Sequence, residues 1–146
     1  MPCFAPTLAV PVSITVQPVD RTVLVRDSPT FTCSVFGTAP VTVTWFRRNT
    51  GEGEGTRVDD NVESVPEVEE GSAEVTVTST LTLPGVSESD DGSLFYCVVS
   101  NNLTEAGLIT NQSDSASLTV QCTLINIFHI ACCHSETLFV TKCLFL

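Results

Sequence analysis

The sequence predicts an all-β protein, built as a two-sheet antiparallel Greek-key sandwich and followed by a C-terminal tail outside the domain. Three observations support this fold class. Apolar and polar residues alternate in short segments between residues 12 and 121, turn-forming residues separate the segments, and the region has no helical period. Several short strands joined by turns are typical of antiparallel sandwiches and barrels.

Each predicted strand has one apolar face, because its apolar residues recur at every second position. Phe31, Cys33 and Val35 alternate with threonine and serine, and the same pattern leads to Trp45 in the next strand. The predicted strands cover, in chain order, residues 30–35, 41–45, 75–83, 95–99 and 116–120. Glycine, proline, aspartate and serine mark turns at residues 27–29, 37–40, 51–55 and 84–85.

Composition divides the chain of 146 residues into three segments. Residues 1–11 are an apolar leader or linker, and they make a poor signal peptide because prolines interrupt them and basic residues are absent. Residues 12–121 form the predicted domain. Residues 122–146 are an unassigned hydrophobic, cysteine-rich tail whose longest apolar run is too short to span a membrane. We interpret this tail as a truncated or read-through continuation; a membrane anchor and a disordered native tail are the alternatives.

Charge and cysteine content limit the classes of partner and compartment. The formal net charge of −11 makes phosphate backbones and anionic lipids poor partners. Seven cysteines are many for a reducing cytosol and ordinary for a secreted chain. The count is odd, so at least one thiol is unpaired or bonded to another chain. The pairing of five cysteines stays open: Cys3, Cys122, Cys132, Cys133 and Cys143.

Three residues form the most specific feature of the sequence. Trp45 lies twelve residues after Cys33, and Cys97 lies sixty-four residues after Cys33. Two sheets that pack about 10 Å apart can be joined by one disulfide, and a tryptophan beside the bridge fills the space around its sulfur atoms.

Together with the residues before Cys97, this framework resembles the immunoglobulin superfamily over residues 12–121. Asp91 and Ser93 stand six and four residues before the second cysteine, as they do in family members. Phe95 replaces the tyrosine that usually stands two residues before it, so ring packing remains and the hydroxyl hydrogen bond is lost. Residues 81–86 and 115–120 resemble the family's strand before this corner and its last strand.

The resemblance implies a disulfide between Cys33 and Cys97 that is buried against Trp45. It also implies a core that includes Phe95, Leu81 and Leu83. An intermediate-type domain fits better than a variable-like one, because residues 109–115 contain no Gly-x-Gly bulge. The arginine that pairs with the corner aspartate in variable domains also has no good candidate, since Arg57 lies too far upstream.

Other motifs favour ordinary structural interpretations over catalytic or metal sites. Residues 51–55 are interpreted as a flexible loop, because two carboxylates within them would repel phosphate. Adjacent cysteines at 132 and 133, followed by His134, lack the spacing of zinc sites. The sandwich contains no catalytic pair, so we expect no enzyme activity, no cofactor and no metal. An acidic group is interpreted as a solvated strand edge with no calcium-loop spacing: Asp59, Asp60, Glu63, Glu67, Glu69 and Glu70.

Two sequons predict N-glycosylation at Asn102 and Asn111. Both fall in the long connection predicted between the last two strands, where an acceptor is exposed. Two sequons in one predicted loop of a disulfide-type domain favour export.

We expect the sheet face formed by the Trp45 and Cys97 strands to bind the partner. Because those two side chains point inward, their neighbours Phe46 and Tyr96 point outward and serve as anchors. Arg47 and Arg48, beside Phe46, supply positive charge that an acidic edge of a second copy would attract. The alternative is that the two rings only cover their own sheet.

The function implied by these features is extracellular protein–protein recognition or cell adhesion, as a module of a larger surface or secreted protein. The partner expected is a protein, with another immunoglobulin-like domain as the candidate in homophilic or heterophilic binding, and neither nucleic acid nor a small-molecule substrate. The expected location is extracellular or at the cell surface, although neither a signal peptide nor an anchor is evident in the sequence. The alternative function is a structural immunoglobulin repeat of an intracellular muscle-type scaffold.

Overall fold

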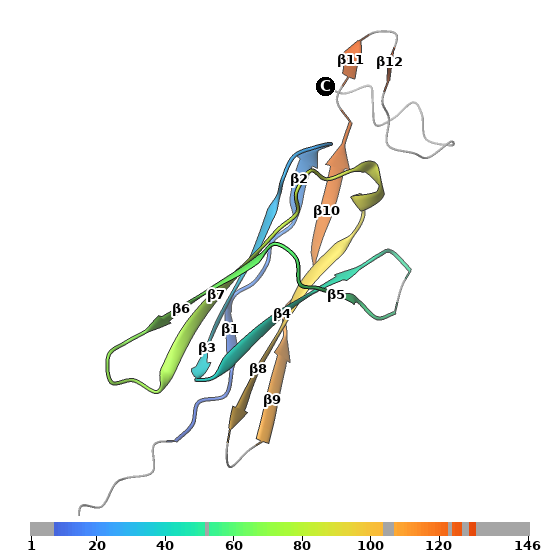
Figure 1. The fold of residues 1–146 in the computed structure, drawn as a ribbon. Helices are drawn as coiled ribbons and strands as arrows, with labels where there is room; N and C mark the ends of the chain where they lie inside the picture. Colours follow the sequence, from blue (N-terminus) through green and yellow to red (C-terminus); the bar gives the residue numbers. More distant parts are fainter. Residues whose placement is uncertain (1–7, 52, 104–106, 123, 127–128, 131–146) are drawn as a thin grey trace, which may run out of the picture.

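The computed structural model describes residues 8–51, 53–103, 107–122, 124–126 and 129–130. It is nearly all β-structure, as the sequence predicts, with one short 3₁₀ helix, η1 (Glu88–Asp90). The strands, labelled in Figure 1, are β1 (Ser13–Val16), β2 (Arg21–Leu24), β3 (Thr30–Thr38), β4 (Val41–Arg48), β5 (Thr56–Val58), β6 (Val62–Val68), β7 (Glu74–Thr82), β8 (Leu94–Leu103), β9 (Gly107–Gln112), β10 (Ala116–Gln121), β11 (Leu124–Asn126) and β12 (His129–Ile130).

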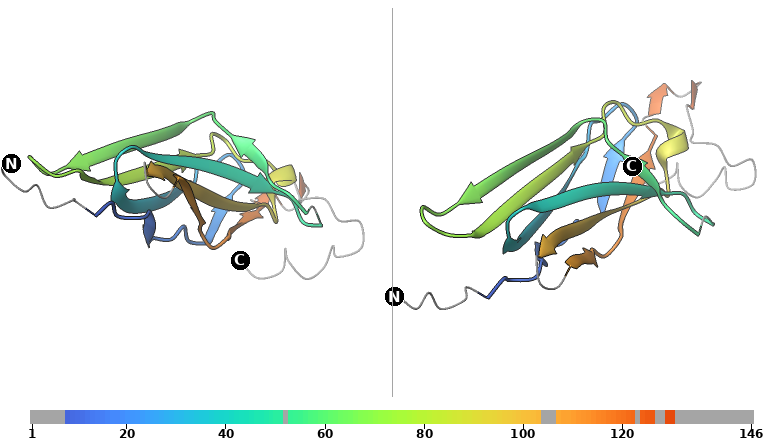
Figure 2. Two further views of the ribbon diagram at one scale, coloured as in Figure 1. Left: turned by 90° about the horizontal axis from the view of Figure 1, so that it is seen from below. Right: turned by 60° about the horizontal axis from the view of Figure 1, so that its bottom comes forward.

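The strands form two principal sheets, which confirms the predicted sandwich. The first sheet has the order β1-β3-β7-β6, and the second has the order β2-β10-β8-β4-β5, with β9 paired to β8. Figure 2 shows β6 and β7 in one layer and β4 and β8 in the other. Strands β11 and β12 pair only with each other.

The N-terminal part of the domain contributes to both sheets. Strand β1 pairs antiparallel with β3 in the first sheet, and β2 pairs parallel with β10 in the second. Just before β1, the carbonyl of Val10 accepts hydrogen bonds from the Thr38 backbone at 3.0 Å and the Asn101 side chain at 3.1 Å. Val12 is buried in the core. The chain therefore passes from the first sheet to the second between β1 and β2.

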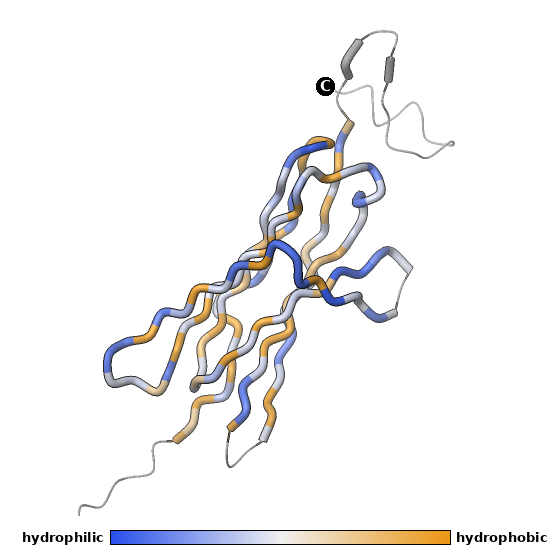
Figure 3. The backbone as a smooth tube through the Cα atoms, in the orientation of Figure 1, coloured by the Kyte–Doolittle hydropathy of each residue, from blue (hydrophilic) through white to orange (hydrophobic). Residues whose placement is uncertain are grey.

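The core contains the residues that the alternating pattern places inward. Phe31, Cys33, Trp45, Phe95 and Cys97 are fully buried. The alternation of apolar and polar residues along the strands is visible in Figure 3. Phe95 stacks on Phe31 with ring centroids 4.8 Å apart, so the phenylalanine at the tyrosine position packs its ring in the core. Of the other predicted core residues, Leu81 is fully buried and Leu83 is half-buried against the same cluster.

Five strands of the sandwich lie outside the predicted ones: β1, β2, β5, β6 and β9. They pack few side chains into the core, so their sequences lack a clear apolar alternation. The long loop predicted between the last two strands is wrong, because β8 and β9 form a hairpin across most of that segment. Strand β9 has no alternating apolar pattern that would predict it, because Ile109 is its one half-buried residue.

Part of the acidic segment after residue 58 forms a strand edge, as predicted. Strand β6 is the outer strand of the first sheet and carries Glu63 and Glu67. Both glutamates and Pro66 are exposed. Negative charge and proline discourage another strand from pairing with an open edge.

Candidate functional site

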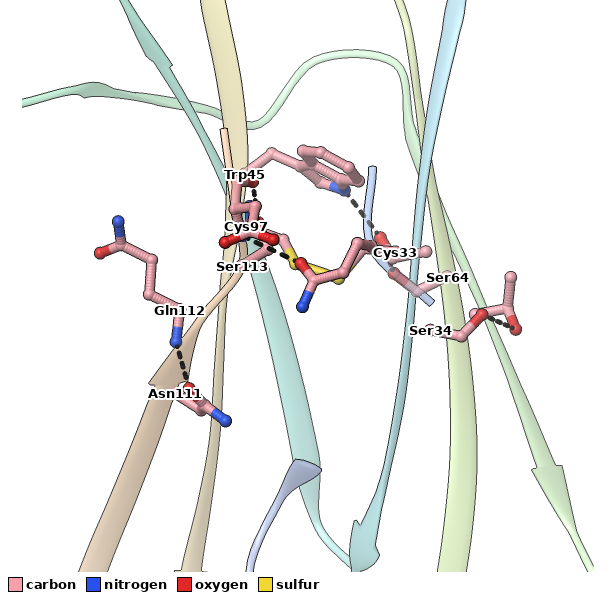
Figure 4. Close-up of a disulfide and its surroundings, with 12 residues drawn as sticks. Cys33, Ser34, Trp45, Ser64, Cys97, Asn111, Gln112 and Ser113 are labelled. Atoms are coloured by element: carbon pink, nitrogen blue, oxygen red, sulfur yellow. Dashed lines mark hydrogen bonds between the residues drawn. A yellow bond between two sulfur atoms is a disulfide. The ribbon is translucent and has the colours of Figure 1, made fainter. Parts of the chain in front are cut away.

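The two sheets are joined by a disulfide between Cys33 and Cys97, which confirms the predicted bridge. Its S–S distance is 2.03 Å, and its two Cα atoms lie 6.7 Å apart. Trp45 lies beside the bridge in Figure 4, and its indole Nε1 donates a hydrogen bond of 3.0 Å to the Ser79 Oγ of the opposite sheet. The bridge connects β3 to β8, and the hydrogen bond connects β4 to β7, so both contacts join the two sheets.

Cys97 is also held from the neighbouring chain segment by Ser113. The Cys97 backbone N–H donates to the Ser113 Oγ at 2.9 Å, and the Ser113 backbone N–H donates to the Cys97 carbonyl at 2.9 Å. The Ser113 hydroxyl donates in turn to the Asp114 carbonyl at 2.8 Å. Figure 4 shows Ser113 directly beside the disulfide. The segment between β9 and β10 is therefore fastened to the cysteine of β8.

Phe46 and Tyr96 share one outer face of the second sheet. They are direct partners in the β4–β8 pair, and their rings stack with centroids 5.5 Å apart and planes at 11°. Phe46 is half-buried. Tyr96 is only 8% exposed, so it supports the Phe46 ring and presents little surface of its own.

The Tyr96 ring is covered from the β4–β5 side. The Arg48 guanidinium carbon lies 5.9 Å from the ring centroid, within the range of a cation–π contact. At Gly55, an added Cβ would come 2.5 Å from the Tyr96 hydroxyl oxygen. The backbone at Gly55 thus approaches the ring more closely than a larger residue permits.

Arg47, which was predicted to share this face, lies on the other side of the sheet from Phe46. In the β4–β8 register it lies opposite Phe95, whose side chain points inward. The Arg47 guanidinium forms an ion pair of 2.8 Å with Asp90 and donates a hydrogen bond of 2.9 Å to Ser93. It also lies 5.8 Å from the centroid of the Phe95 ring. The two-residue period that turns Phe46 outward turns Arg47 inward.

This ion pair lies near the corner before Cys97, but it is made by Asp90 and not by the corner residue Asp91. Asp90 is held by Ser87, whose backbone N–H donates to the carboxylate at 2.8 Å. Burial opposes ionisation of Asp90, but the hydrogen bonds from Ser87 and the charge of Arg47 outweigh it, so the pKa of Asp90 lies below its usual value. The neighbouring Asp91 accepts a hydrogen bond of 2.7 Å from the Val120 backbone. Sequence distance does not reveal this pair, because β4 and η1 are brought together only by the fold.

Charge is divided between the two sheets. The second sheet contains Arg21, Arg47, Arg48 and Arg57, and its described strands contain no aspartate or glutamate. The described strands of the first sheet carry Glu63, Glu67 and Glu74 and no arginine or lysine. Arg57 is paired with Asp59 at 2.6 Å. Arg48 is therefore the cation of the Phe46 face for which the structure shows no acidic partner among the described residues.

The predicted glycosylation residues lie on strands of the β8–β9 hairpin. Asn102 is exposed near the end of β8, and Asn111 is exposed on β9. The Asn111 side-chain oxygen accepts a hydrogen bond of 2.9 Å from the Gln112 backbone. Thr104, which completes the first sequon, lies outside the described residues.

Other sequence features fall partly outside the structure. Cys3, Cys132, Cys133 and Cys143 are not among the described residues, and Cys122 is half-buried after β10. Across the described ranges, no three His, Cys, Asp or Glu side chains gather closely enough to hold a metal ion. Within the same ranges, no helix has the length and apolar character needed to cross a membrane.

Comparisons with known proteins identify the family. A family model described as immunoglobulin domain matches residues 11–101, and no curated protein matches the chain. The structure of Rst D1-D2 is similar, with a TM-score of 0.55 and 18% identity over 77% of this chain and 49% of that chain. A titin domain complex with obscurin-like 1 gives a TM-score of 0.50 and 19% identity, covering 80% of this chain and 99% of that chain.

A three-domain fragment of the titin I-band is 28% identical, with a TM-score of 0.48, and covers 77% of this chain and 33% of that chain. The chain thus spans about half of the Rst structure and a third of the titin fragment. The family match over more than half of the residues, the two-sheet arrangement and the Cys33–Cys97 bridge show that the chain belongs to the immunoglobulin domain family.

Proposed function

We propose that this domain is a protein-recognition module that works outside the cell, in adhesion or receptor contacts. The observation that carries the proposal is the buried disulfide between Cys33 and Cys97. Disulfides persist in oxidising compartments and are rare in the cytosol. The two exposed sequon asparagines, Asn102 and Asn111, agree with passage through the secretory pathway. No part of the proposal requires a catalytic group.

The proposed binding surface is the outer face of β4 and β8 around Phe46 and Arg48. Phe46 is a half-buried aromatic residue fixed by stacking on Tyr96, which lowers the entropy lost when it is covered by a partner. Aromatic and arginine side chains are enriched among residues that dominate binding energy. The strands of this face carry no acidic residue, and the positive charge of Arg48 suits an acidic partner.

A second copy of the domain offers such an acidic surface. Strand β6 presents Glu63 and Glu67 at an open sheet edge, with Val65 half exposed between them. Contact between the Arg48 face of one copy and the β6 edge of another would be heterologous, since two different surfaces meet. Such contacts extend along an array of molecules and do not close into a symmetric dimer.

The location is tested by peptide mapping of the natural protein isolated from its source without reduction. We expect a Cys33–Cys97 linked peptide and glycan on Asn102. Reduced cysteines and an unmodified Asn102 would contradict the extracellular function and favour the structural repeat of an intracellular scaffold.

The binding face is tested by charge exchange in sedimentation experiments. Phe46→Ser and Arg48→Glu are each expected to weaken self-association by about 2 kcal/mol if they behave as hot spots. Glu63→Lys with Glu67→Lys is expected to weaken it as well, and mixing this variant with Arg48→Glu should restore association. Leu24→Ser serves as a control, because this exposed residue lies on β2, away from the face. Unaltered association in Phe46→Ser and Arg48→Glu would exclude the face.

A further inference from the structure

We propose that Asn111 is an N-glycosylation site that accepts its glycan only before the domain folds, because folding hides the hydroxyl of its sequon beside the disulfide. The inference rests on the proposed extracellular function, since only exported chains meet the glycosyl transferase. It adds an order of events: the modification at Asn111 precedes closure of the Cys33–Cys97 bridge.

The two ends of the sequon have opposite environments in the folded domain. Asn111 is exposed on β9, so a glycan attached there is compatible with the fold. Ser113 is only 5% exposed. The sequon requires a serine or threonine hydroxyl two residues after the asparagine. The folded state therefore leaves the acceptor accessible and removes the recognition group.

Three hydrogen bonds hold Ser113 in this buried position. Its hydroxyl accepts from the Cys97 backbone N–H at 2.9 Å and donates to the Asp114 carbonyl at 2.8 Å. Its backbone N–H donates to the Cys97 carbonyl at 2.9 Å. Figure 4 shows Ser113 beside the bridge, with its contact ending on the bonded Cys97, and Gln112 and Asn111 further from the bridge. Release of the hydroxyl requires separation of this segment from β8.

The transfer reaction needs both groups at once. The Asn111 side-chain nitrogen attacks C1 of the first sugar of a lipid-linked oligosaccharyl pyrophosphate, a C–N bond forms, and the C1–O bond to the pyrophosphate breaks. The lipid pyrophosphate leaves, and the amide nitrogen loses one proton to a base of the transferase. In the folded domain the Asn111 oxygen is also occupied, since it accepts the Gln112 backbone N–H at 2.9 Å.

The timing of synthesis leaves a window for this reaction. Ser113 follows Cys97 by 16 residues, which takes roughly 1–3 s at about 5–20 residues per second. Disulfide formation takes seconds to hours. The two processes therefore compete, and the occupancy of Asn111 measures which one comes first.

The test is cell-free synthesis with microsomes of the full chain fused to a cleavable signal peptide. Occupancy of Asn102 and Asn111 is read by glycopeptide mass spectrometry, with and without reductant. We expect occupancy of Asn111 to rise by about twofold or more when the bridge cannot form, either in reductant or in Cys33→Ser, because closure is slow enough to compete. Cys122→Ser is the matched control, since it removes a cysteine and leaves Cys33 and Cys97 intact; it should equal the wild type.

The outcomes separate this inference from the proposed function. Equal but incomplete occupancy of Asn111 in wild type and Cys33→Ser, or an Asn111 that stays unmodified under every condition, would overturn the inference. Full occupancy in both proteins, with no transfer to the oxidised domain, would support it. Transfer to Asn111 in the purified, oxidised domain would overturn it too. Because the signal peptide is supplied, these results do not depend on the natural location of the chain, which the mapping of the natural protein decides separately.

Discussion

Single side chains fix the sandwich through polar contacts as well as apolar packing. Trp45 fills the space beside the disulfide, but its orientation depends on a hydrogen bond to Ser79, which is itself fully buried. Ser64 donates a second hydrogen bond to Ser79 at 2.9 Å. Leaving a buried donor without an acceptor lowers the free energy of unfolding by more than the intact hydrogen bond contributes to it. The residue opposite the tryptophan therefore matters as much as the tryptophan.

Ser79→Ala should lower the free energy of unfolding by about 1–3 kcal/mol, because it leaves the Trp45 Nε1 buried without an acceptor. Urea titration followed by tryptophan fluorescence measures the change. Ser64→Ala is the matched control, since it removes one contact of Ser79 and retains the indole hydrogen bond; its effect should be smaller. Stability losses of equal size in the two variants would contradict this account.

The Arg47–Asp90 pair makes stability depend on pH in a defined direction. Because folding lowers the pKa of Asp90, the unfolded chain binds more protons as the pH falls. The contribution is complete at neutral pH, begins to decline near the ordinary aspartate pKa of about 3.9, and is lost as the pH falls through the lowered value. Denaturation measured from pH 7 to pH 2 should show a shallower loss in Asp90→Asn than in the wild type. Parallel curves would exclude a role for this carboxyl.

Strands that bury one face in the core could be predicted from the sequence, and strands at the sheet edges could not. Strands β3, β4, β7, β8 and β10 have apolar faces in the core, and the alternating pattern predicted each of them. Strands β5 and β6 lie at sheet edges, where one set of neighbours is missing and polar residues are tolerated on both faces. Their pairing depends on backbone hydrogen bonds with an adjacent strand, and a pattern of side chains does not encode that partner.

The candidate site divides in the same way. The disulfide and the outward direction of Phe46 follow from the two-residue period. The cover over Tyr96 depends on Gly55, which returns to the ring after the β4–β5 turn. The partner of Arg47 depends on η1, which lies more than forty residues away. Contacts between separate loops require the three-dimensional path of the chain.

Strand β6 should pair with strands of other molecules when its negative charges are removed. Glu63→Val with Glu67→Val leaves an edge with apolar side chains and open backbone groups, which favours strand pairing between molecules. Light scattering should show assemblies of this variant. The assemblies should persist when Arg48→Glu is added to the same chain, because edge pairing does not depend on the proposed charge contact. Glu69→Val with Glu70→Val, just beyond the strand, is the control and should stay unassociated by this route. A monomeric β6 variant would show that Pro66 alone protects the edge.

At the scale of the whole molecule, the fold combines one covalent bridge with a divided charge distribution. The disulfide closes a segment with a sequence separation of 64. Arginines gather on the strands of one sheet and glutamates on the strands of the other, so the two sheets differ in charge. Salt weakens attraction between exposed charges, so association by these faces should decline as ionic strength rises.

Replacing both bridge cysteines by alanine should destabilise the domain by about 4 kcal/mol on the chain-entropy model, because the unfolded chain regains the freedom of the closed loop. Differential scanning calorimetry measures the loss as a lower melting temperature. Cys122→Ala leaves the bridge in place and is the control for removal of a cysteine; its loss of stability should be smaller than that of the double variant. A double variant with unchanged stability would mean that packing around Trp45 supplies nearly all of the connection between the sheets.

The crossing of the N-terminal segment between sheets also determines how the domain bears tension. Strands β2 and β10 run parallel with four residue pairs in register, and Val25 adds a backbone hydrogen bond of 3.0 Å to Gln121. The described chain enters at the Val10 end of the sandwich and leaves β10 at the opposite end (Figure 1). Pulling on both ends therefore slides β2 along β10, and all bonds of the pair share the load at once. An antiparallel hairpin pulled at its open end would instead break one bond at a time.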